Sequence, residues 1–379
     1  MTRYPSAAQV FSRPVDLALK LGTQAEYECV AHEPDSYIKR TPKYKIVKKF
    51  LHKFLYMLVN RQLDLFREKL DIQSRVLFLY TGKDSFGDAN MELSGRALLK
   101  ERDVRIDLFT LPKLYPQFKE DDIFENVYTH IQEIDVESYD AILLAEFNHR
   151  SLRLKYRYFA RTPFACLFGY FDGPDRNQVC FSHAAFNKIF SLGMNDADLL
   201  KVAKPYLHGS LETAHSIEGS VPTQDFLTLS IGGVDPYRTY QYWADFLHLL
   251  DAKASLLGIK NVVLVGSDNG RSTAIELIAE EFDQLQLSSQ VGQMSLLQTR
   301  ALIARAKIFV GCDGGLMHIA HSTSTPTVAL FSNAEPAELR ITIACRCQAL
   351  QSTGNVSKIP PNRILGAVES AFEIASDRF

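Results

Sequence analysis

The chain has 379 residues, of which 46% are hydrophobic and 23% are charged, and its formal net charge is −2. This balance excludes a general electrostatic preference for nucleic acid, and the length suits two domains that each bury a core. The six cysteines form no C-x-x-C pair and no metal-ligand spacing, so we expect reduced thiols and no metal site. The N-terminal segment has no long apolar region, and no stretch reaches the roughly 20 apolar residues of a membrane-spanning helix, so we expect a cytoplasmic protein.

Residues 1–70 are predicted to form a basic, partly helical N-terminal extension. Residues 39–69 are dense in Lys and Arg, and only Asp64 and Glu68 oppose them. Apolar residues recur here at three- and four-residue spacing, which predicts an amphipathic helix: Phe50, Leu51, Phe54, Leu55, Leu58 and Val59. Two interpretations stay open. The helix packs on a domain with its charged face in solvent, or residues 39–69 contact the anionic inner face of the cytoplasmic membrane, where each Lys or Arg contributes about 1 kcal/mol.

Residues 71–205 are predicted to form an N-terminal Rossmann-like domain. Apolar runs predict strands at 75–81, 104–110, 139–147 and 163–171, and a helix at 91–102 follows the first of them. Strands that are apolar throughout and alternate with helices indicate a parallel sheet covered on both faces.

Residues 206–379 are predicted to form a second Rossmann-like domain. Residues 205–225 gather Gly, Ser, Pro and Thr without periodicity, which is typical of a linker. Strands and helices then alternate, with strands predicted at 226–233, 261–267, 307–311 and 327–331, and helices at 237–257, 272–282, 295–306 and 363–375 and a short one between the last two strands. Two doubly wound α/β domains facing a central cleft would bind ligands at the carboxyl ends of their strands.

The segment GCDGGLMH, residues 311–318, interrupts two apolar runs. Gly314 and Gly315 allow a tight turn and leave backbone N–H groups uncovered. These groups lie where a helix begins, and a helix N-terminus attracts a phosphate. Asp313 could simply cap that helix, and His318 could simply be a core residue. An acid, two glycines and a histidine at one strand–helix junction favour a nucleotide diphosphate site.

The loop after the first strand carries a second group of polar residues. It contains Lys83, Asp84, Ser85, Gly87 and Asp88, and a helix follows. A carboxylate in such a loop can accept a proton from an attacking hydroxyl, which accelerates a reaction by roughly 10²–10⁴-fold. The alternative is that Asp84 or Asp88 caps the helix predicted near Asn90.

Two further strand ends in the second domain carry candidate ligands. After residues 226–233, Gly232 leads into a loop with Arg238, whose charge could neutralise a diphosphate leaving group, although a solvent-facing role is equally open. After residues 261–267, the turn contains Ser267, Asp268 and Asn269, which are suited to contact a nucleoside. This turn is not G-x-G-x-x-G, which disfavours a nicotinamide-dependent dehydrogenase.

These segments, in this order, resemble glycosyltransferase family 9, the bacterial lipopolysaccharide heptosyltransferase family of GT-B fold. The block at 292–331 is similar to the family pattern of G-x-x-S-L, an alanine-rich helix, a strand, D-[TS]-G-x-M-H-x-A and P-x-V-A-L-F. The matching positions are Gly292, Ser295, Leu296, Asp313, Gly315, Met317, His318, Ala320, Pro326 and Phe331. Gly87 and Asp88 match the family's Gly-Asp loop. Arg238 stands where the family has a lysine, and Gly314 where it has a threonine.

The resemblance implies an inverting, metal-independent glycosyltransferase. Its Asp88 would deprotonate the acceptor hydroxyl, beside an acceptor-side loop of Lys83, Ser85 and Gly87. The implied donor-binding residues are Gly232, Arg238, Ser267, Asp268, Asn269, Met294, Asp313, Gly314, Gly315, Leu316 and His318.

The implied reaction moves a heptose or related sugar from a nucleotide diphosphate, such as ADP-heptose, to a lipopolysaccharide or another surface glycan. The sugar nucleotide is a co-substrate, and no cofactor is expected. Two alternatives remain: a GT-B binding or scaffold protein without transfer activity, and a nucleotide-sugar epimerase.

Overall fold

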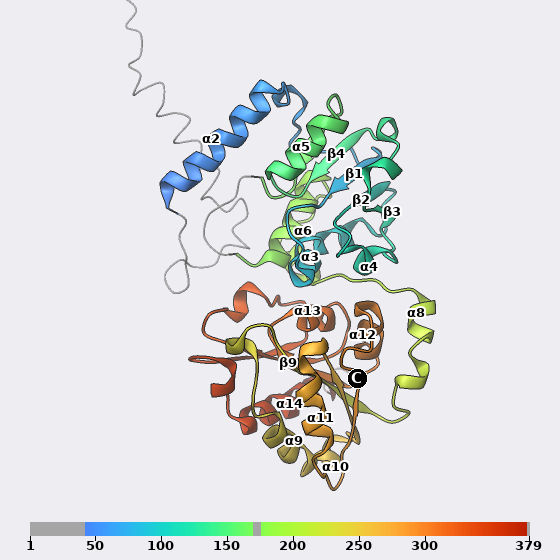
Figure 1. Cartoon of the computed structure of the whole chain (residues 1–379), viewed down its shortest axis with the longest axis vertical. Coiled ribbons are helices and arrows are strands. Elements are labelled where there is room, and N and C mark those ends of the chain that lie inside the picture. The colour runs from blue at the N-terminus through green and yellow to red at the C-terminus, as the bar shows by residue number, and fades with distance from the viewer. Residues whose placement is uncertain (1–41, 170–175, 377–379) are drawn as a thin grey trace, which may run out of the picture. The chain divides into compact units, whose positions relative to one another are not determined.

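The computed structural model describes residues 42–169 and 176–376, which form two compact units (Figure 1). The first unit contains the residues up to Ser85 together with Gly95–Lys201. The second contains Phe86–Ser94 together with the chain from Val202 onward. The chain therefore contributes a short segment to the second unit before it completes the first.

The first unit is built on a five-stranded parallel sheet in the order β3-β2-β1-β4-β5. Its strands are β1 (Val76–Leu79), β2 (Ile106–Phe109), β3 (Phe124–Tyr128), β4 (Ala141–Leu144) and β5 (Phe164–Cys166). Successive side chains of β1 serve opposite faces. Leu77 and Leu79 share a core with Leu152 of α5 (His149–Tyr158), whereas Phe78 packs on Phe186 of α6 (Gln178–Ile189). Both faces are covered, and this explains the apolar runs in the sequence.

A fully buried ion pair links the connections on either side of β2. Arg96 donates to Asp121 from Nε at 3.1 Å and from a terminal nitrogen at 2.5 Å, and both side chains have no exposed surface. Asp121 also accepts from the backbone N–H groups of Ile123 and Phe124. The carboxylate is thus held by four hydrogen bonds in the interior.

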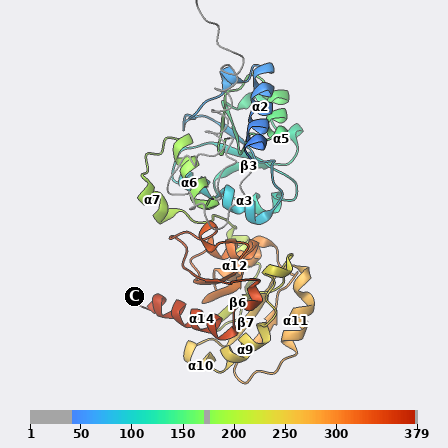
Figure 2. The ribbon, with the colours of Figure 1, turned by 90° about the vertical axis from the view of Figure 1, so that its left-hand side faces the viewer.

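The helix predicted within the basic extension is α2 (Lys43–Val59), and it lies alongside α5 (Figures 1 and 2). Its apolar side chains divide between two environments. Phe50 and Met57 are buried, whereas Leu55, Leu58 and Val59 are 53%, 51% and 78% exposed. The helix therefore packs on the first unit by one side and keeps a second apolar side uncovered by the described residues.

The remaining short helices of the first unit are α4 (Tyr115–Phe118) and α7 (Asp196–Val202), the latter ending at the boundary between the units. Turns of 3₁₀ helix punctuate both units, at Leu63–Leu65, Ser94–Leu99, Ile131–Glu133, Val136–Ser138, Glu218–Ser220, Pro236–Arg238, Asp268–Gly270, Ala337–Leu339 and Val356–Lys358.

The second unit is built on a six-stranded parallel sheet in the order β11-β10-β9-β6-β7-β8. Its strands are β6 (Phe226–Ser230), β7 (Asn261–Val265), β8 (Gln286–Ser289), β9 (Ile308–Cys312), β10 (Thr327–Phe331) and β11 (Cys347–Gln351). The first strand, β6, is central, because β7 pairs with it on one side and β9 on the other. All strands run in the same direction, but the order in which the chain adds them reverses between β6 and β9: β7 and β8 follow on one side of β6, and β9, β10 and β11 follow on the other.

Helices cover both faces of the second sheet. They are α8 (Leu211–His215), α9 (Trp243–Asp251), α10 (Ala254–Leu257), α11 (Arg271–Ile278), α12 (Leu296–Ile303), α13 (Gly315–His321) and α14 (Pro361–Ser376). Leu229 and Val310 share a core with Trp243 of α9 and Val368 of α14 on one face, and Figure 2 shows these two helices together. The opposite face buries Phe309 with α12 and α13. The segment 86–94, which forms α3 (Phe86–Glu92), packs on α13.

The apolar strands predicted from the sequence are confirmed at β1, β2, β4, β5, β6, β7, β9 and β10, most of them shorter than predicted. The strand predicted at 163–171 is limited to Phe164–Cys166, and its last two predicted residues, 170–171, lie outside the described residues. The sequence missed β3, β8 and β11. All three lie at sheet edges and are partly exposed, so their side chains are mostly polar or mixed, as in Gln-Leu-Ser-Ser of β8. An edge strand lacks the continuous apolar run on which the predictions depended.

Three predicted helical or linker boundaries were also wrong. The helix expected near Asn90 begins at Phe86 and ends at Glu92, and a 3₁₀ turn continues to Leu99. The helix expected over 237–257 is divided into α9 and α10. The segment 205–225, expected to be a linker, contains α8. Ser210 caps the N-terminus of this helix, because its hydroxyl accepts a hydrogen bond from the backbone N–H of Thr213. Within the ranges 42–169 and 176–376, no helix has the length and apolar character to cross a membrane.

Candidate functional site

The candidate donor residues gather at the carboxyl edge of the second sheet. The loops after β6, β7, β8, β9 and β10 all leave this edge, because every strand is parallel. The reversal between β6 and β9 separates the loop that carries Arg238 from the loop that carries Asp313. Such a reversal point is where open α/β sheets bind their ligands.

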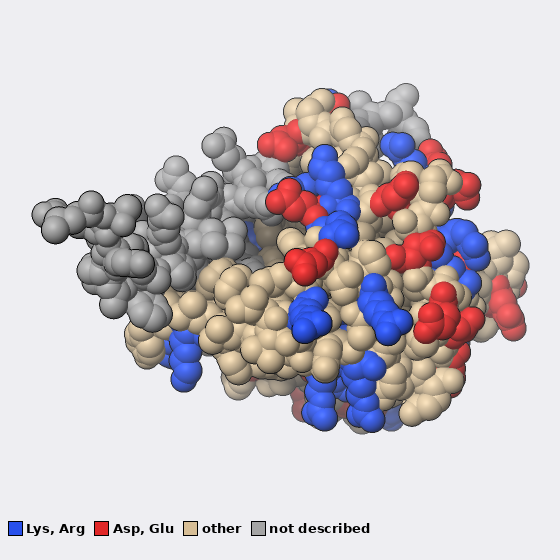
Figure 3. Space-filling model, turned by 90° about the horizontal axis from the view of Figure 1, so that it is seen from above, with Lys and Arg blue, Asp and Glu red and all other residues tan. Residues whose placement is uncertain are grey.

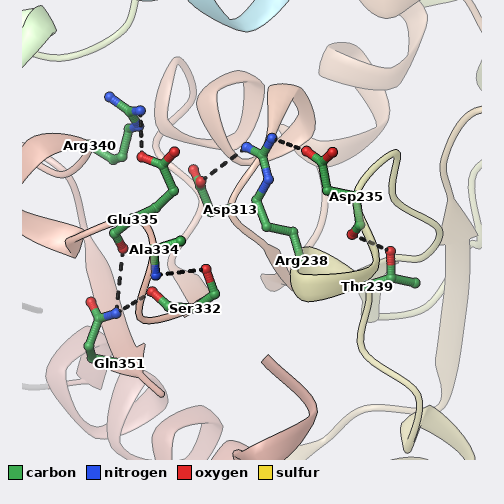
Figure 4. Close-up of polar contacts among 9 residues, drawn as sticks. All are labelled: Asp235, Arg238, Thr239, Asp313, Ser332, Ala334, Glu335, Arg340 and Gln351. Carbon is green, nitrogen blue, oxygen red and sulfur yellow. Dashed lines mark hydrogen bonds and ion pairs between the residues drawn. The ribbon is translucent and has the colours of Figure 1, made fainter. Parts of the chain in front are cut away.

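Arg238 joins these two loops (Figure 4). Its guanidinium donates to Asp235 at 2.5 Å and to Asp313 at 3.4 Å. Asp313 is almost completely buried, with 2% of its side chain exposed, whereas 29% of the Arg238 side chain remains exposed. The solvent-facing interpretation of Arg238 is therefore only partly correct, since one side of the guanidinium is held and the other is open.

Burial dominates the electrostatics of this pair. It raises the pKa of Asp313, while the charges of Arg340 and Arg238 partly offset the effect and Glu335 adds to it. Burial also disfavours the charged form of Arg238, but the hydrogen bond to Asp235 and the charge of Asp313 outweigh it, so the pKa of Arg238 is raised. An arginine that stays charged beside an incompletely bonded carboxylate is suited to bind a polar, anionic ligand.

The loop after β10 contributes charged residues that sequence reasoning missed. Glu335 pairs with Arg340 at 2.7 Å, and Gln351 of β11 donates from its amide to the backbone carbonyls of Ser332 and Glu335 (Figure 4). Both charges act on the pKa of Asp313. Only their position in the sequence could have indicated these residues, because they follow the strand 327–331 and therefore lie at the same sheet edge as Asp313.

The turn after β9 keeps its backbone amides uncapped. No side chain caps α13, and Gly314, at φ 165°, has an extended backbone that any residue could adopt. Asp313 instead accepts from Arg238, so the capping alternative does not describe this aspartate. The first amides of a helix have no partner within it, and a ligand or water must satisfy them.

Glycine allows α3 and α13 to approach closely. A Cβ atom at Gly315 would lie 2.8 Å from a ring carbon of Phe86, and one at Gly87 would lie 3.5 Å from the imidazole of His318. Asn90 donates from its amide to the carbonyl of His318 at 3.2 Å. Asp88 lies in the first turn of α3 and is partly exposed, so it does not cap a helix that starts at Asn90.

The interior beside this helix pair contains unsatisfied polar atoms. Among the described residues, Nδ1 of His318, both ring nitrogens of His321 and Oδ1 of Asn90 are buried without a hydrogen-bond partner. Burial lowers the pKa of His318 well below its usual range, with further lowering by His321, Arg340 and Arg238. Burial also lowers the pKa of His321 to about 4. Both imidazoles are therefore neutral at pH 7.

The loops after β6 and β7 hold each other in place. Asn269 donates from its amide to the carbonyl of Gly233 at 2.7 Å and accepts from the Ser267 hydroxyl at 2.8 Å. Gly232 has a φ of +85°, and a Cβ there would lie 2.9 Å from the Asn269 side chain. Asp268 pairs with Arg271 and lies against the backbone of Gly292, which follows β8. The predicted nucleoside-side residues thus form one connected surface.

The other predicted residues are more dispersed. The side chains of Met294 and Leu316 are partly buried and pack against the core that α12 and α13 share. Lys83 and Ser85 are exposed in the loop before α3. Asp84 is exposed and pairs with Lys113 at 3.5 Å. Within the described part of the chain, no group of three or more His, Cys, Asp and Glu side chains is arranged to hold a metal ion.

Residues 244–359 match the family model described as glycosyltransferase family 9 (heptosyltransferase). This segment includes the predicted site residues from Ser267 to His318, whereas Asp88 and Arg238 lie outside it. No curated protein is similar in sequence to the chain.

Solved structures with the same fold cover most of the chain. A glycosyl transferase family 9 protein from Veillonella parvula has a TM-score of 0.61 at 15% identity, covering 80% of this chain and 99% of its own. The E. coli ADP-heptose lps heptosyltransferase II has a TM-score of 0.58 at 18% identity, covering 80% and 99%. E. coli heptosyltransferase WaaC with ADP-2-deoxy-2-fluoro heptose has a TM-score of 0.53 at 18% identity, covering 78% and 99%.

Together the family model and the fold confirm three predictions: the resemblance to glycosyltransferase family 9, the α/β fold of GT-B type, and a glycosyltransferase.

Proposed function

We propose that this family 9 glycosyltransferase moves a heptose or related sugar from a nucleoside diphosphate to a hydroxyl of a lipopolysaccharide or other bacterial surface glycan, with inversion and without a metal ion. One observation carries the proposal: the buried Asp313 is bound by the half-open Arg238 at the reversal point of the second sheet. The donor class is supported by similar folds solved with ADP and with ADP-2-deoxy-2-fluoro heptose.

The donor would lie along the carboxyl edge. Ser267, Asp268 and Asn269 would contact the nucleoside, because their loop is fixed against the loop after β6. The amides at Gly314, Gly315 and Leu316 would bind the diphosphate together with the open side of Arg238. Asp313 and the neutral His318 would border the sugar, where a carboxylate and a neutral imidazole can accept hydrogen bonds from hydroxyl groups.

Leaving-group charge would be stabilised by fixed donors. Negative charge grows on the diphosphate as the glycosidic bond breaks, and the guanidinium of Arg238 and the helix amides are already oriented toward it. Preorganised donors of this kind contribute several kcal/mol of transition-state stabilisation. This is the role that a metal ion fills in other transferases.

Asp88 would act as the general base. It lies on the helix whose neighbouring residues Phe86 and Gly87 contact the start of α13, so its turn of helix is fixed relative to the donor-side turn. Deprotonation of the acceptor hydroxyl would let that oxygen attack the anomeric carbon opposite the diphosphate, which inverts the configuration. Lys83, Ser85 and Gly87 would form the acceptor-side loop.

The test is Asp88→Asn, which keeps the shape and removes the base. We expect turnover to fall by about 10²–10⁴-fold while the donor Kd, measured by calorimetry with the nucleotide, changes less than about twofold. Asp84→Asn is the matched control, because Asp84 lies four residues earlier and is exposed. Full turnover by Asp88→Asn would show that another group is the base.

Product analysis separates the two alternative functions. Without acceptor, an epimerase would convert the nucleotide sugar into its epimer, whereas a transferase would leave its sugar unchanged. A scaffold protein would bind nucleotide and give no transfer with any acceptor extract.

We also propose that residues 39–69 contact the anionic inner face of the cytoplasmic membrane. The support is α2, which carries exposed Leu55, Leu58 and Val59 beside exposed lysines such as Lys45 and Lys48. Anionic vesicles should sediment the protein at low salt and less at high salt, since surface attraction is screened within about 10 Å at 0.1 M salt. Binding that ignores salt, or no binding, would disprove the contact.

A further inference from the structure

A cavity of about 400 Å³ opens beside α5 in the first unit. Its lining residues come from the end of β2 and from one side of α5: Phe109, His149, Arg150, Arg153, Leu154, Arg157 and Tyr158. The volume lies within the range of small-molecule sites. None of these residues was singled out by the sequence or used in the proposed transfer.

Three arginines give the cavity its charge. Arg150, Arg153 and Arg157 are spaced by three and four residues, so they project from one side of the helix, and all three are exposed. The helix contains no acidic residue. Among the described residues, none of the three guanidinium groups is paired with a carboxylate. Guanidinium groups that converge without an acidic partner are suited to bind a phosphate.

The floor of the cavity is apolar. Phe109 is buried in the core of the first unit, and Leu154 and Tyr158 are partly buried against the same core. A free phosphate would use the arginines and leave this floor unoccupied. An amphiphile would use both, with its phosphate on the arginines and its hydrocarbon on the floor.

The neighbouring helix indicates where such an amphiphile would come from. α2 contacts α5 through His52 and His149, whose ring nitrogens lie 3.1 Å apart. Like α5, α2 contains no acidic residue, and its exposed Leu55 and Leu58 extend the apolar surface. Figure 3, the view from above, shows Lys and Arg side chains interspersed with Asp and Glu next to an uncharged area. Basic and apolar side chains together are typical of a surface that contacts anionic lipid.

We propose that the cavity beside α5 binds the phosphate and adjoining glycerol of an anionic membrane phospholipid. The proposal rests on the proposed membrane contact of residues 39–69 and adds a defined headgroup site to it. Arg150, Arg153 and Arg157 bind the phosphate, and Leu154 and Tyr158 contact the hydrocarbon next to it. The site orients the first unit on the bilayer.

The experiment measures binding of the full-length protein to vesicles of phosphatidylcholine with and without phosphatidylglycerol. Replacing Arg150, Arg153 and Arg157 with Gln should weaken binding to the phosphatidylglycerol vesicles by about 100-fold, since each arginine near such a surface contributes roughly fivefold. The matched control replaces Arg102, Lys119 and Arg161 with Gln. It removes the same charge from exposed positions of the same unit and should change binding less than about threefold. Equal losses in the two triple variants would overturn the proposal.

A second variant tests the cavity without changing charge. Leu154→Trp fills the floor and should weaken binding to phosphatidylglycerol vesicles by about 10-fold, with unchanged circular dichroism and melting temperature as the folding check. Wild-type affinity in this variant would contradict the site. So would sub-millimolar binding of inorganic phosphate that blocks vesicle binding completely, because it would identify a free-phosphate site.

Variants of α2 show whether a negative result rules out only the headgroup site beside α5 or also the membrane contact of residues 39–69. Replacing Lys45 and Lys48 with Gln tests the contact of residues 39–69. If this pair weakens binding while the α5 variants do not, the contact stands and the headgroup site is wrong. If only the α5 variants weaken binding, the headgroup site stands and the α2 contact is wrong.

Discussion

Two buried pairs of arginine and aspartate lie in different surroundings, one in each unit. Asp121 accepts four hydrogen bonds, and its partner Arg96 is completely buried between the rings of Phe118 and Phe124. Asp313 is nearly as buried, but among the described residues it accepts a single hydrogen bond, the 3.4 Å contact from Arg238. The guanidinium in that second pair is shared with Asp235 and partly open.

The difference shows how a buried carboxylate that is suited to bind a ligand can be told from one that only stabilises the fold. A carboxylate that the fold uses for stability has its hydrogen-bonding capacity filled by its own chain. A carboxylate that the fold buries and leaves under-bonded lowers stability unless water or a ligand supplies the missing hydrogen bonds. The pair in the first unit is therefore structural, and the pair in the second unit is the one that we propose contacts a substrate.

The largest expected effect concerns the structural pair. Arg96→Met leaves the Asp121 charge buried without its cation and should lower the free energy of unfolding by about 3–5 kcal/mol, as measured by urea denaturation. Arg102→Met, at an exposed position nearby in the chain, should change it by less than about 0.5 kcal/mol. A small loss in Arg96→Met would mean that the pair is not structural and would break the comparison.

The open arginine should affect turnover more than stability. Arg238→Gln removes the charge that we propose binds the diphosphate, so we expect turnover to fall by about 10²–10³-fold. Its free energy of unfolding should change by less than about 1 kcal/mol, because the side chain is partly solvated. Arg238→Lys should recover part of the rate, since lysine restores the charge without the fork of donors. Arg346→Gln, at an exposed position, is the control for a general charge effect.

The pH dependence of stability should reveal the buried carboxyl of Asp313. Burial raises the pKa of Asp313, so folding favours the protonated carboxyl. Its contribution to stability is complete below the unfolded pKa and is lost as pH rises through the folded pKa. Wild type should therefore lose stability relative to Asp313→Asn as the pH rises above about 4, the unfolded pKa of an aspartate. A constant difference between wild type and Asp313→Asn would refute the assignment.

The smallest expected effect concerns metal ions. If Arg238 and the helix amides stabilise the leaving group, an excess of EDTA should change turnover by less than about twofold. Loss of activity that added divalent metal restores would show that the open arginine does not act alone.

Much of the fold was readable from the sequence because central parallel strands are buried on both faces. Runs such as Val-Leu-Phe-Leu of β1 and Thr-Val-Ala-Leu-Phe of β10 have no polar face, and each was found. Three edge strands, β3, β8 and β11, were not found, since their exposed sides carry polar residues, whereas the fully buried edge strand β5 was found. The packing of α3 on α13 could not be read from the sequence, because the close approach of Phe86 to Gly315 joins residues that are far apart in the chain.

The candidate site was readable only in part. Strand ends located Asp313, Arg238 and Asn269, because the carboxyl edge of a parallel sheet follows from the order of the elements. Glu335 and Arg340 were missed, although they follow a predicted strand, since an acid and a base in a loop carry no distinct pattern. The number of hydrogen bonds that Asp313 accepts cannot be read from the sequence, because it depends on which side chains of the folded protein lie close enough to donate to it.

The passage of residues 86–94 into the second unit has a consequence for any attempt to dissect the protein. A fragment beginning at Val202 would contain every strand of the second sheet and still lack α3. The start of α13, where Gly315 contacts the ring of Phe86, would then be exposed to water. Such a fragment would have the complete sheet but would lack a helix that packs on it. Because residues 86–94 lie in the chain between two parts of the first unit, the second unit cannot be excised complete as one continuous fragment.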